Sequence, residues 1–194
     1  MRPRVLLVTL LLVAVGWVAW RSQLWTVARP GDSPEALRLR AADMRTPVRI
    51  EATLPAVPVG MERLESGRGV LLIHYWAPWE HASREQAALL DSLRQLPEMQ
   101  GLRVVVVCFD PFPSVARFVA RQRLRLSVLI DGRGALRAAL PCPSVPYTYV
   151  VDGAGGLAVA QPGEVDWLAP ATRETLTTLL GEPAAKRATA PTSL

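Results

Sequence analysis

The chain has 194 residues, 50% of them hydrophobic, and a net charge of +5 at pH 7. Without an apolar N-terminal segment and a linker, about 120 residues remain, enough for one hydrophobic core. The densest basic stretch lacks interleaved aromatic residues and predicts a solvated face, so no nucleic-acid partner is expected; it contains Arg117, Arg121, Arg123 and Arg125. Two histidines and two distant cysteines give no metal-ligand spacing, so neither a metal nor a cofactor is expected.

The first 25 residues have the pattern of a signal anchor. An apolar run from Val5 to Trp20 follows the basic residues Arg2 and Arg4, as in a signal sequence or an uncleaved anchor. No cleavage site with small residues follows, which favours a single-pass transmembrane helix across residues 5–20. Because basic residues stay in the cytoplasm, we expect an inner (cytoplasmic) membrane location, with the C-terminal domain in the periplasm or outside the cell.

Residues 26–60 are expected to form a juxtamembrane helix and a linker. The stretch from Ser33 to Arg45 predicts a short amphipathic helix capped by its first residue. Val48 to Ala52 alternates like an edge strand, whose extension Pro55 and Pro58 would limit.

The main domain is expected at residues 61–181, and its first half has an α/β pattern. Gly69–Trp76 and Arg103–Phe109 are apolar runs typical of strands buried on both faces. Between them, Ala82–Leu96 has apolar residues at helical spacing, and Ser114 is expected to cap a second helix. Buried parallel strands joined by helices predict an α/β sheet.

The second half predicts an antiparallel hairpin followed by a helix. Tyr147–Asp152 and Leu157–Ala160 alternate on either side of a glycine-rich turn. A helix from Pro170 to Leu180 should stop at Gly181. The predicted order is therefore β-α-β-α-β-β-α, and residues 182–194 are expected to be a disordered tail.

Two motifs in this frame carry a family resemblance. Trp76-Ala77-Pro78-Trp79 ends the first strand, and Val145-Pro146-Tyr147-Thr148-Tyr149 precedes the hairpin. Together with Asp110 after the second strand, they resemble the thioredoxin superfamily, and in particular its membrane-anchored TlpA/ResA-like branch of thiol-disulfide oxidoreductases. The resemblance covers residues 61–181. It implies a thioredoxin-like α/β fold, with a central mixed sheet flanked by helices and a cis-proline at Pro146.

The family turn continues as W-A-x-W-C-x-x-C, but Glu80 and Ser83 occupy the two cysteine positions here. Disulfide exchange needs an attacking thiolate and a resolving thiol, so this turn cannot perform it and the enzymatic assignment stays open. For Glu80, two interpretations remain: its carboxylate mimics the reduced thiolate toward a partner, or it is an acid favoured by the helix dipole.

The other reactive side chains also leave alternatives. His74 is either a proton relay beneath the turn or a hydrogen-bonded core histidine. Cys108 and Cys142 are two unpaired thiols, a structural disulfide or a displaced redox pair. A hydrolase using His81 and Ser83 is disfavoured, because neighbours within one helical turn diverge and no oxyanion hole is evident.

The leading functional hypothesis is a redox-inactive binding or accessory module. The resemblance implies that the Pro146 loop presents backbone groups to an extended segment and that the pathway is cell-envelope thiol/disulfide handling or cytochrome maturation. A periplasmic or membrane protein partner is expected to bind the Trp79–Ser83 turn and the Pro146 loop; the expected binding residues are Trp79, Glu80, His81, Val145, Pro146 and Tyr147. The alternative is an atypical thiol-disulfide oxidoreductase that uses Cys108 and Cys142.

Overall fold

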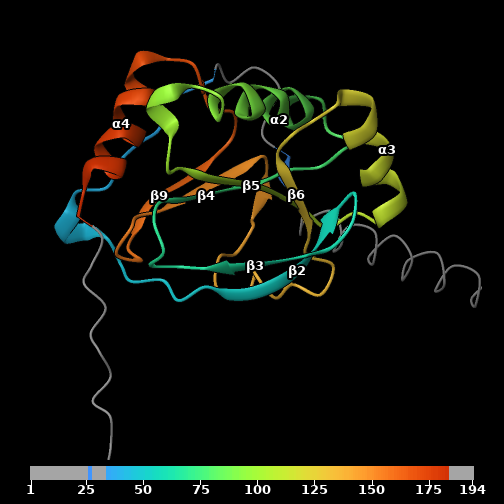
Figure 1. Ribbon diagram of the computed structural model, residues 1–194, viewed down its shortest axis with the longest axis horizontal. Coiled ribbons are helices and arrows are strands. Elements are labelled where there is room, and N and C mark those ends of the chain that lie inside the picture. The colour runs from blue at the N-terminus through green and yellow to red at the C-terminus, as the bar shows by residue number, and fades with distance from the viewer. Residues whose placement is uncertain (1–25, 28–33, 184–194) are drawn as a thin grey trace, which may run out of the picture.

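The computed structural model describes residues 26–27 and 34–183, and a mixed sheet forms its centre (Figure 1). The sheet has seven strands in the order β3-β2-β6-β5-β4-β8-β9. These strands are β2 (Glu51–Val57), β3 (Met61–Glu65), β4 (Leu71–Tyr75), β5 (Arg103–Cys108), β6 (Ser127–Ile130), β8 (Tyr147–Val151) and β9 (Leu157–Pro162). A separate parallel pair joins β1 (Thr26–Val27) to β7 (Ser144–Val145).

Helices cover one face of this sheet (Figure 1). They are α2 (His81–Leu93), α3 (Phe112–Gln122) and α4 (Pro170–Gly181), and two short 3-10 turns are η1 (Ala42–Met44) and η2 (Pro97–Met99). Strand β4 pairs with β5 in parallel and β5 pairs with β6 in parallel, whereas β8 is antiparallel to both β4 and β9. The mixed α/β fold and the hairpin predicted from the sequence are therefore confirmed.

The sheet separates two hydrophobic clusters because successive side chains of a strand point to opposite faces. On the helical face, Leu72 and Val106 pack in one cluster with Leu90 and Leu176. On the other face, Ile73 belongs to a second cluster. Each fully buried Val, Leu or Ile stabilises the fold by about 1.5–3 kcal/mol relative to exposure. The doubly buried strands β4 and β5 thus hold both layers together.

Residues 34–60 are packed against the domain, which corrects their description as a helix and linker. The predicted helix from Ser33 to Arg45 is wrong for the described part, since only the η1 turn is helical there. Instead, the Arg40 N–H donates to the Ala158 carbonyl at 2.9 Å, and Leu37 is 5% exposed. Tertiary hydrogen bonds thus replace the helical ones, and residue 60 is not where the packed domain begins.

The expected edge strand at residues 48–52 is also corrected. Strand β2 begins at Glu51, runs through Pro55 and lies between β3 and β6. The edge strand beside β2 is β3, which was not predicted from the sequence. Its alternating charges, Glu62, Arg63 and Glu65, fit an exposed edge that resists pairing with another chain.

Further differences concern α3 and β6. Helix α3 begins at Phe112 with Pro111 at the N-cap, so Ser114 lies inside the first turn and does not cap the helix; its hydroxyl donates to the Pro111 carbonyl at 2.8 Å. Strand β6 has only four residues, too few to show a clear period, and the predicted element order omitted it. Helix α3 is the crossover between β5 and β6.

No helix within residues 34–183 is long and apolar enough to cross a membrane. The predicted anchor at residues 1–25 and the tail from residue 184 lie outside the described residues.

Candidate functional site

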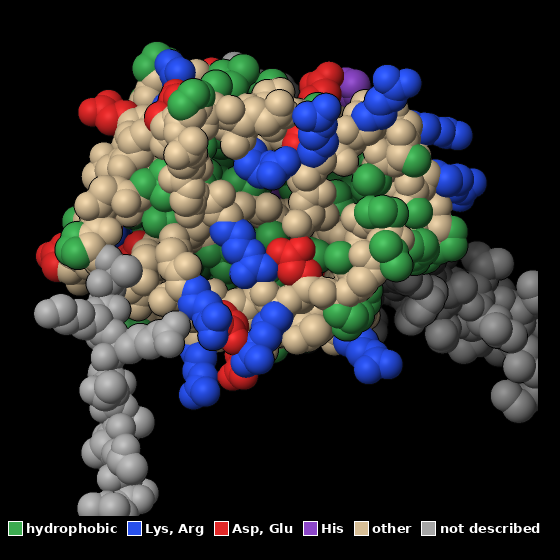
Figure 2. Space-filling view, in the orientation of Figure 1, with side chains coloured by type: hydrophobic (Ala, Val, Ile, Leu, Met, Phe, Trp, Pro, Cys, Tyr) green, Lys and Arg blue, Asp and Glu red, His purple; other side chains and the backbone are tan. Residues whose placement is uncertain are grey.

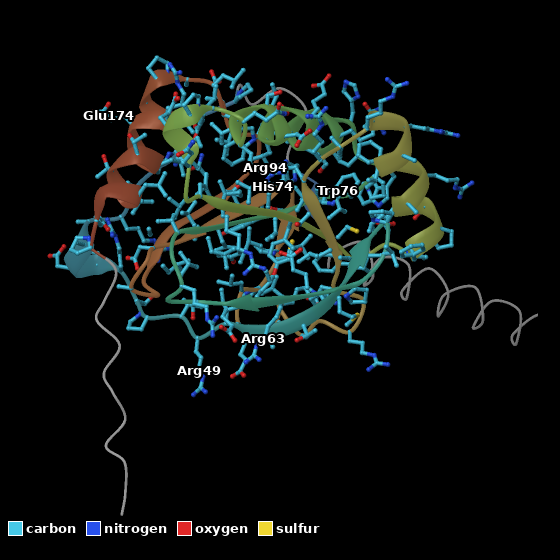
Figure 3. The ribbon with its side chains drawn as sticks, in the orientation of Figure 1. Arg49, Arg63, His74, Trp76, Arg94 and Glu174 are labelled. Carbon is cyan, nitrogen blue, oxygen red and sulfur yellow. The ribbon has the colours of Figure 1, made fainter. Side chains whose placement is uncertain are left out.

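The tryptophan turn, which contains Trp76 and Trp79, connects β4 to α2 and is fixed by contacts with β5 and α3. The Trp76 N–H donates to the Val107 carbonyl at 3.0 Å, which continues the pairing of β4 with β5. The Trp76 ring is fully buried and packs on Phe118 of α3, with 4.7 Å between ring centroids. Figure 3 shows Trp76 in the layer between the sheet and the helices. Strand and helix together therefore fix where the exposed part of the turn lies.

Glu80 is the N-cap of α2. Its two carboxylate oxygens accept hydrogen bonds from the N–H groups of Ala82 at 3.1 Å and Ser83 at 2.5 Å. These N–H groups have no partner within the helix, and a negative charge beside them is favoured by the helix dipole. The structure therefore gives the Glu80 carboxylate a definite local role, which is to stabilise the start of α2.

Two side chains of the turn face solvent. Trp79 is 55% exposed, and His81 is also exposed. Arg84 donates to His81 Nδ1 at 3.1 Å, so His81 Nε2 carries the proton toward Glu85 Oε1, 3.2 Å away. His81 is therefore engaged on both ring nitrogens by its own helix.

The side of the turn near Glu164 is acidic. Burial raises the pKa of Glu164, and the neighbouring carboxylates Glu80 and Glu85 raise this pKa further, while His81 opposes them. Carboxylates of α2 and of its cap are thus close enough to Glu164, in the loop after β9, to affect its charge. Within the described residues, no group of three or more potential metal ligands has the geometry to hold a metal ion.

Ser83 and His74 lie inside the protein beneath this surface. Ser83 is fully buried, and neither its Oγ nor His74 Nε2 has a hydrogen-bond partner within residues 34–183. His74 Nδ1 lies 3.0 Å from Thr148 Oγ1, and its ring meets Trp167 edge-on at 5.7 Å. Complete burial lowers the pKa of His74 to about 3. His74 is therefore a neutral core histidine, as the second sequence interpretation held, and Figure 3 shows it under α2.

The Pro146 loop lies where β7 leads into β8. The Val145–Pro146 peptide bond is cis, and the Pro146 carbonyl accepts from the Gly163 N–H at 2.9 Å. Val145 is fully buried, whereas Tyr147 is half-buried and packs on Tyr149, with 4.8 Å between ring centroids. Tyr147 is therefore the most exposed of Val145, Pro146 and Tyr147.

The strand edge next to Pro146 is already paired. Thr26 and Val27 of β1 lie parallel to Ser144 and Val145 of β7. On the edge of β7 that β1 occupies, an added extended segment would have to take the place of β1. This intramolecular pairing was not expected from the sequence, because the residues are more than a hundred positions apart.

The structure does not bring the two cysteines together. Both are free thiols. Cys108 belongs to the cluster on the helical face, whereas Cys142 packs against the cluster on the opposite face. Burial raises the pKa of each thiol to about 12, so both are protonated at neutral pH and neither is an activated nucleophile. The disulfide interpretation is therefore wrong for this structure.

Solved structures that share the fold of this chain are thiol:disulfide interchange proteins and related proteins. A protein from Chlorobium tepidum assigned as the thiol:disulfide interchange protein DsbE aligns with a TM-score of 0.63 at 19% identity, covering 71% of this chain and 98% of that one. A thioredoxin family thiol:disulfide interchange protein from Chlorobium tepidum TLS aligns at 0.60 and 15% identity, covering 73% and 100%. StoA from Bacillus subtilis aligns at 0.57 and 14% identity, covering 69% and 98%.

The protein thus has the thioredoxin-like fold, which the similar thiol:disulfide interchange proteins also have. No protein-family model and no curated protein matches the chain.

Proposed function

We propose that this protein is a thioredoxin-fold binding module that recognises a protein partner without exchanging disulfides. The observation that supports it most is the state of the turn: at the start of α2, a carboxylate caps the helix through both oxygens, and a serine lies buried behind it. The sequence resemblance puts the reactive cysteines of related proteins at these positions. No thiol of the chain replaces them, because Cys108 and Cys142 lie in clusters on opposite faces of the sheet.

The proposed recognition surface consists of Trp79, His81 and Tyr147. Trp79 and Tyr147 provide large, stiff aromatic surfaces with few rotatable bonds, which are favoured at protein interfaces. The proposed pathway is cell-envelope thiol/disulfide handling or cytochrome maturation, as the resemblance implies. A negative charge at Glu80 in place of a thiolate would let the module engage partners of such a pathway without reacting with them.

The proposed location is the inner membrane, with the domain on its outer side. The apolar run across residues 5–20 and the preceding Arg2 and Arg4 support this orientation. Alkaline extraction should leave the full-length protein in the membrane fraction. A periplasmic phosphatase fused after Leu194 should be active; an inactive fusion would contradict the orientation.

Insulin reduction by the full-length protein tests the absence of thiol chemistry. We expect no turnover above that of the Cys108→Ser/Cys142→Ser variant, and two titratable thiols in urea both with and without prior reduction. The double substitution Glu80→Cys/Ser83→Cys is the positive control, because a thiol at this helix start has its pKa lowered by the exposed N–H groups. Turnover that depends on Cys108 or Cys142 would support the oxidoreductase alternative instead.

A photoreactive residue at position 147 tests partner recognition. We expect one dominant crosslinked protein in cells, and we expect Trp79→Ala to abolish the crosslink without lowering stability, since Trp79 is 55% exposed. Leu168→Ala removes another exposed hydrophobic side chain and serves as the matched control. If both variants retain the crosslink, the turn is not part of the recognition surface.

A further inference from the structure

A groove runs between the tryptophan turn and α3. Its volume is about 460 Å³, and its walls include the aromatic rings of Trp79 and Phe118. Binding sites for small molecules and peptide side chains commonly have volumes of about 300–1,000 Å³.

Arginine dominates the charge of this groove. Arg84, Arg117 and Arg121 line it, and Asp110 is its one lining carboxylate. Figure 2 shows basic side chains gathered over α3 at the side of the molecule. Burial raises the pKa of Asp110, which means that its surroundings do not favour its charge. The balance of formal charge in the lining is therefore positive.

The groove arginines have no carboxylate partners among residues 34–183. Arg84 donates to the carbonyls of Pro78 and Trp79 and to His81. Arg117 donates to the Pro113 carbonyl at 3.1 Å. Some arginines on other parts of the described surface are paired: Arg63 pairs with Glu51 and Glu65, and Arg173 pairs with Glu98. Guanidinium groups bind carboxylates through paired, charge-assisted hydrogen bonds, so this cluster is complementary to acidic side chains.

The remaining segments of the chain supply little of this complement. Residues 1–25 and 184–194 contain no aspartate or glutamate, and residues 28–33 contain one carboxylate, that of Asp32. A second copy of the chain carries the same net charge of +5, which opposes close approach at low salt. The charge of the groove therefore favours a different, acidic molecule.

We propose that this groove binds an acidic, extended segment of the partner protein, with carboxylates on Arg117 and Arg121 and an apolar side chain against Trp79 and Phe118. This inference deepens the proposed function, because Trp79 belongs both to the groove and to the proposed recognition surface. It identifies the partner by its chemistry: a run of aspartate and glutamate interrupted by an apolar residue.

Fluorescence anisotropy with the full-length protein tests the groove. The probe is a fluorescein-labelled peptide of sequence Glu-Glu-Asp-Leu-Glu-Glu-Asp, and its uncharged counterpart is Gln-Gln-Asn-Leu-Gln-Gln-Asn. We expect only the acidic peptide to bind at low salt. Its affinity should fall steeply as NaCl is raised, because the Debye length shrinks to about 10 Å at 0.1 M and about 3 Å at 1 M.

Two double variants with equal loss of charge locate the site. Arg117→Gln/Arg121→Gln should weaken binding of the acidic peptide by about tenfold, which corresponds to about 1.4 kcal/mol, because two exposed charge pairs are lost. Arg123→Gln/Arg125→Gln removes two arginines outside the groove lining and should weaken binding by less than about threefold. Asp110→Asn should strengthen binding by about twofold, because it removes a like charge.

Three results would overturn the groove proposal. One is equal binding of the acidic and uncharged peptides, and another is an equal effect of the two double variants, which would indicate only the overall positive charge. The third is self-association of the protein that Arg117→Gln/Arg121→Gln abolishes, which would assign the groove to a second copy.

If the peptide does not bind while crosslinking at position 147 persists, the groove proposal fails alone. If the peptide binds while cysteine-dependent insulin turnover occurs, the proposed function fails alone.

Discussion

Two polar regions of the molecule hold charge in opposite ways. Near the chain end of α4, Arg45 contacts Asp152 at 3.1 Å and Glu182 at 2.5 Å, and the Arg45 and Asp152 side chains are only 7% and 8% exposed. In the groove between the tryptophan turn and α3, the arginines have no carboxylate partners in the described part of the chain. The charges of the Arg45 cluster are paired with one another inside the protein, whereas the arginines of the groove face solvent.

The difference shows which charges hold the fold and which are available to a partner. A buried charge is costly unless it is paired, so removing one member of a buried pair destabilises the protein strongly. Exposed charge pairs contribute only about 0–1 kcal/mol to stability. Removing an exposed charge is therefore expected to change the affinity for a partner more than the free energy of unfolding. Arg45 also connects three separate segments: its own, the turn of the β8–β9 hairpin and the residue after α4.

Arg45→Met is expected to have the largest effect on stability. It would lower the free energy of unfolding by about 3 kcal/mol, because the nearly buried Asp152 carboxylate loses its cation. Urea unfolding of the full-length protein measures this. Arg63→Met is the matched control, since Arg63 forms exposed ion pairs and points outward in Figure 3; its cost should stay below about 1 kcal/mol. Equal costs would show that the Arg45 cluster is not a structural unit.

His74 should make the stability of the protein pH-dependent. Its folded pKa is lowered to about 3, whereas in the unfolded chain it is about 6.5. Below pH 6.5 the unfolded state therefore takes up a proton that the folded state does not. This uptake lowers the free energy of unfolding by about 1.4 kcal/mol per pH unit, until the pH approaches the folded pKa.

His74→Gln removes this term, so urea unfolding at pH 7, 5.5 and 4.5 should show parent and variant converging as the pH falls. The difference between their free energies of unfolding should change by about 2–3 kcal/mol across that range. His81→Gln removes the exposed histidine and controls for the substitution itself. If parent and His74→Gln keep the same pH slope, His74 does not titrate on unfolding.

Glu80 combines a structural role with a proposed binding role, because its charge stabilises the start of α2 and it lies between Trp79 and His81 of the proposed recognition surface. Glu80→Ala should lower the free energy of unfolding by about 1 kcal/mol, as expected for loss of an N-cap. Glu80→Ser should restore most of that stability, since serine is a good N-cap, but it removes the charge. If the charge is recognised, Glu80→Ser should reduce crosslinking at position 147 at least fivefold. Unchanged crosslinking would leave Glu80 with the capping role alone.

The sequence predicted the central elements because their patterns are local. The apolar runs of β4 and β5, the helical spacing of α2 and the glycine-rich turn of the β8–β9 hairpin each lie within a single segment. The extended path of residues 34–41 could not be found in this way, because its hydrogen bonds go to residues such as Ala158 and Glu164, more than a hundred positions away. Short strands such as β6 and β7 carry too few residues to show a period.

By itself, the sequence determined the layered α/β core and the absence of cysteine at the start of α2, since both depend on residue identity and local periodicity. Only the tertiary structure decided that Cys108 and Cys142 lie in clusters on opposite faces of the sheet and that Arg117 and Arg121 share a groove with Trp79. The physical reason is that these relations depend on how helices and loops pack across the sheet. That packing results from many long-range contacts, whereas a sequence motif predicts only the local structure of the segment that contains it.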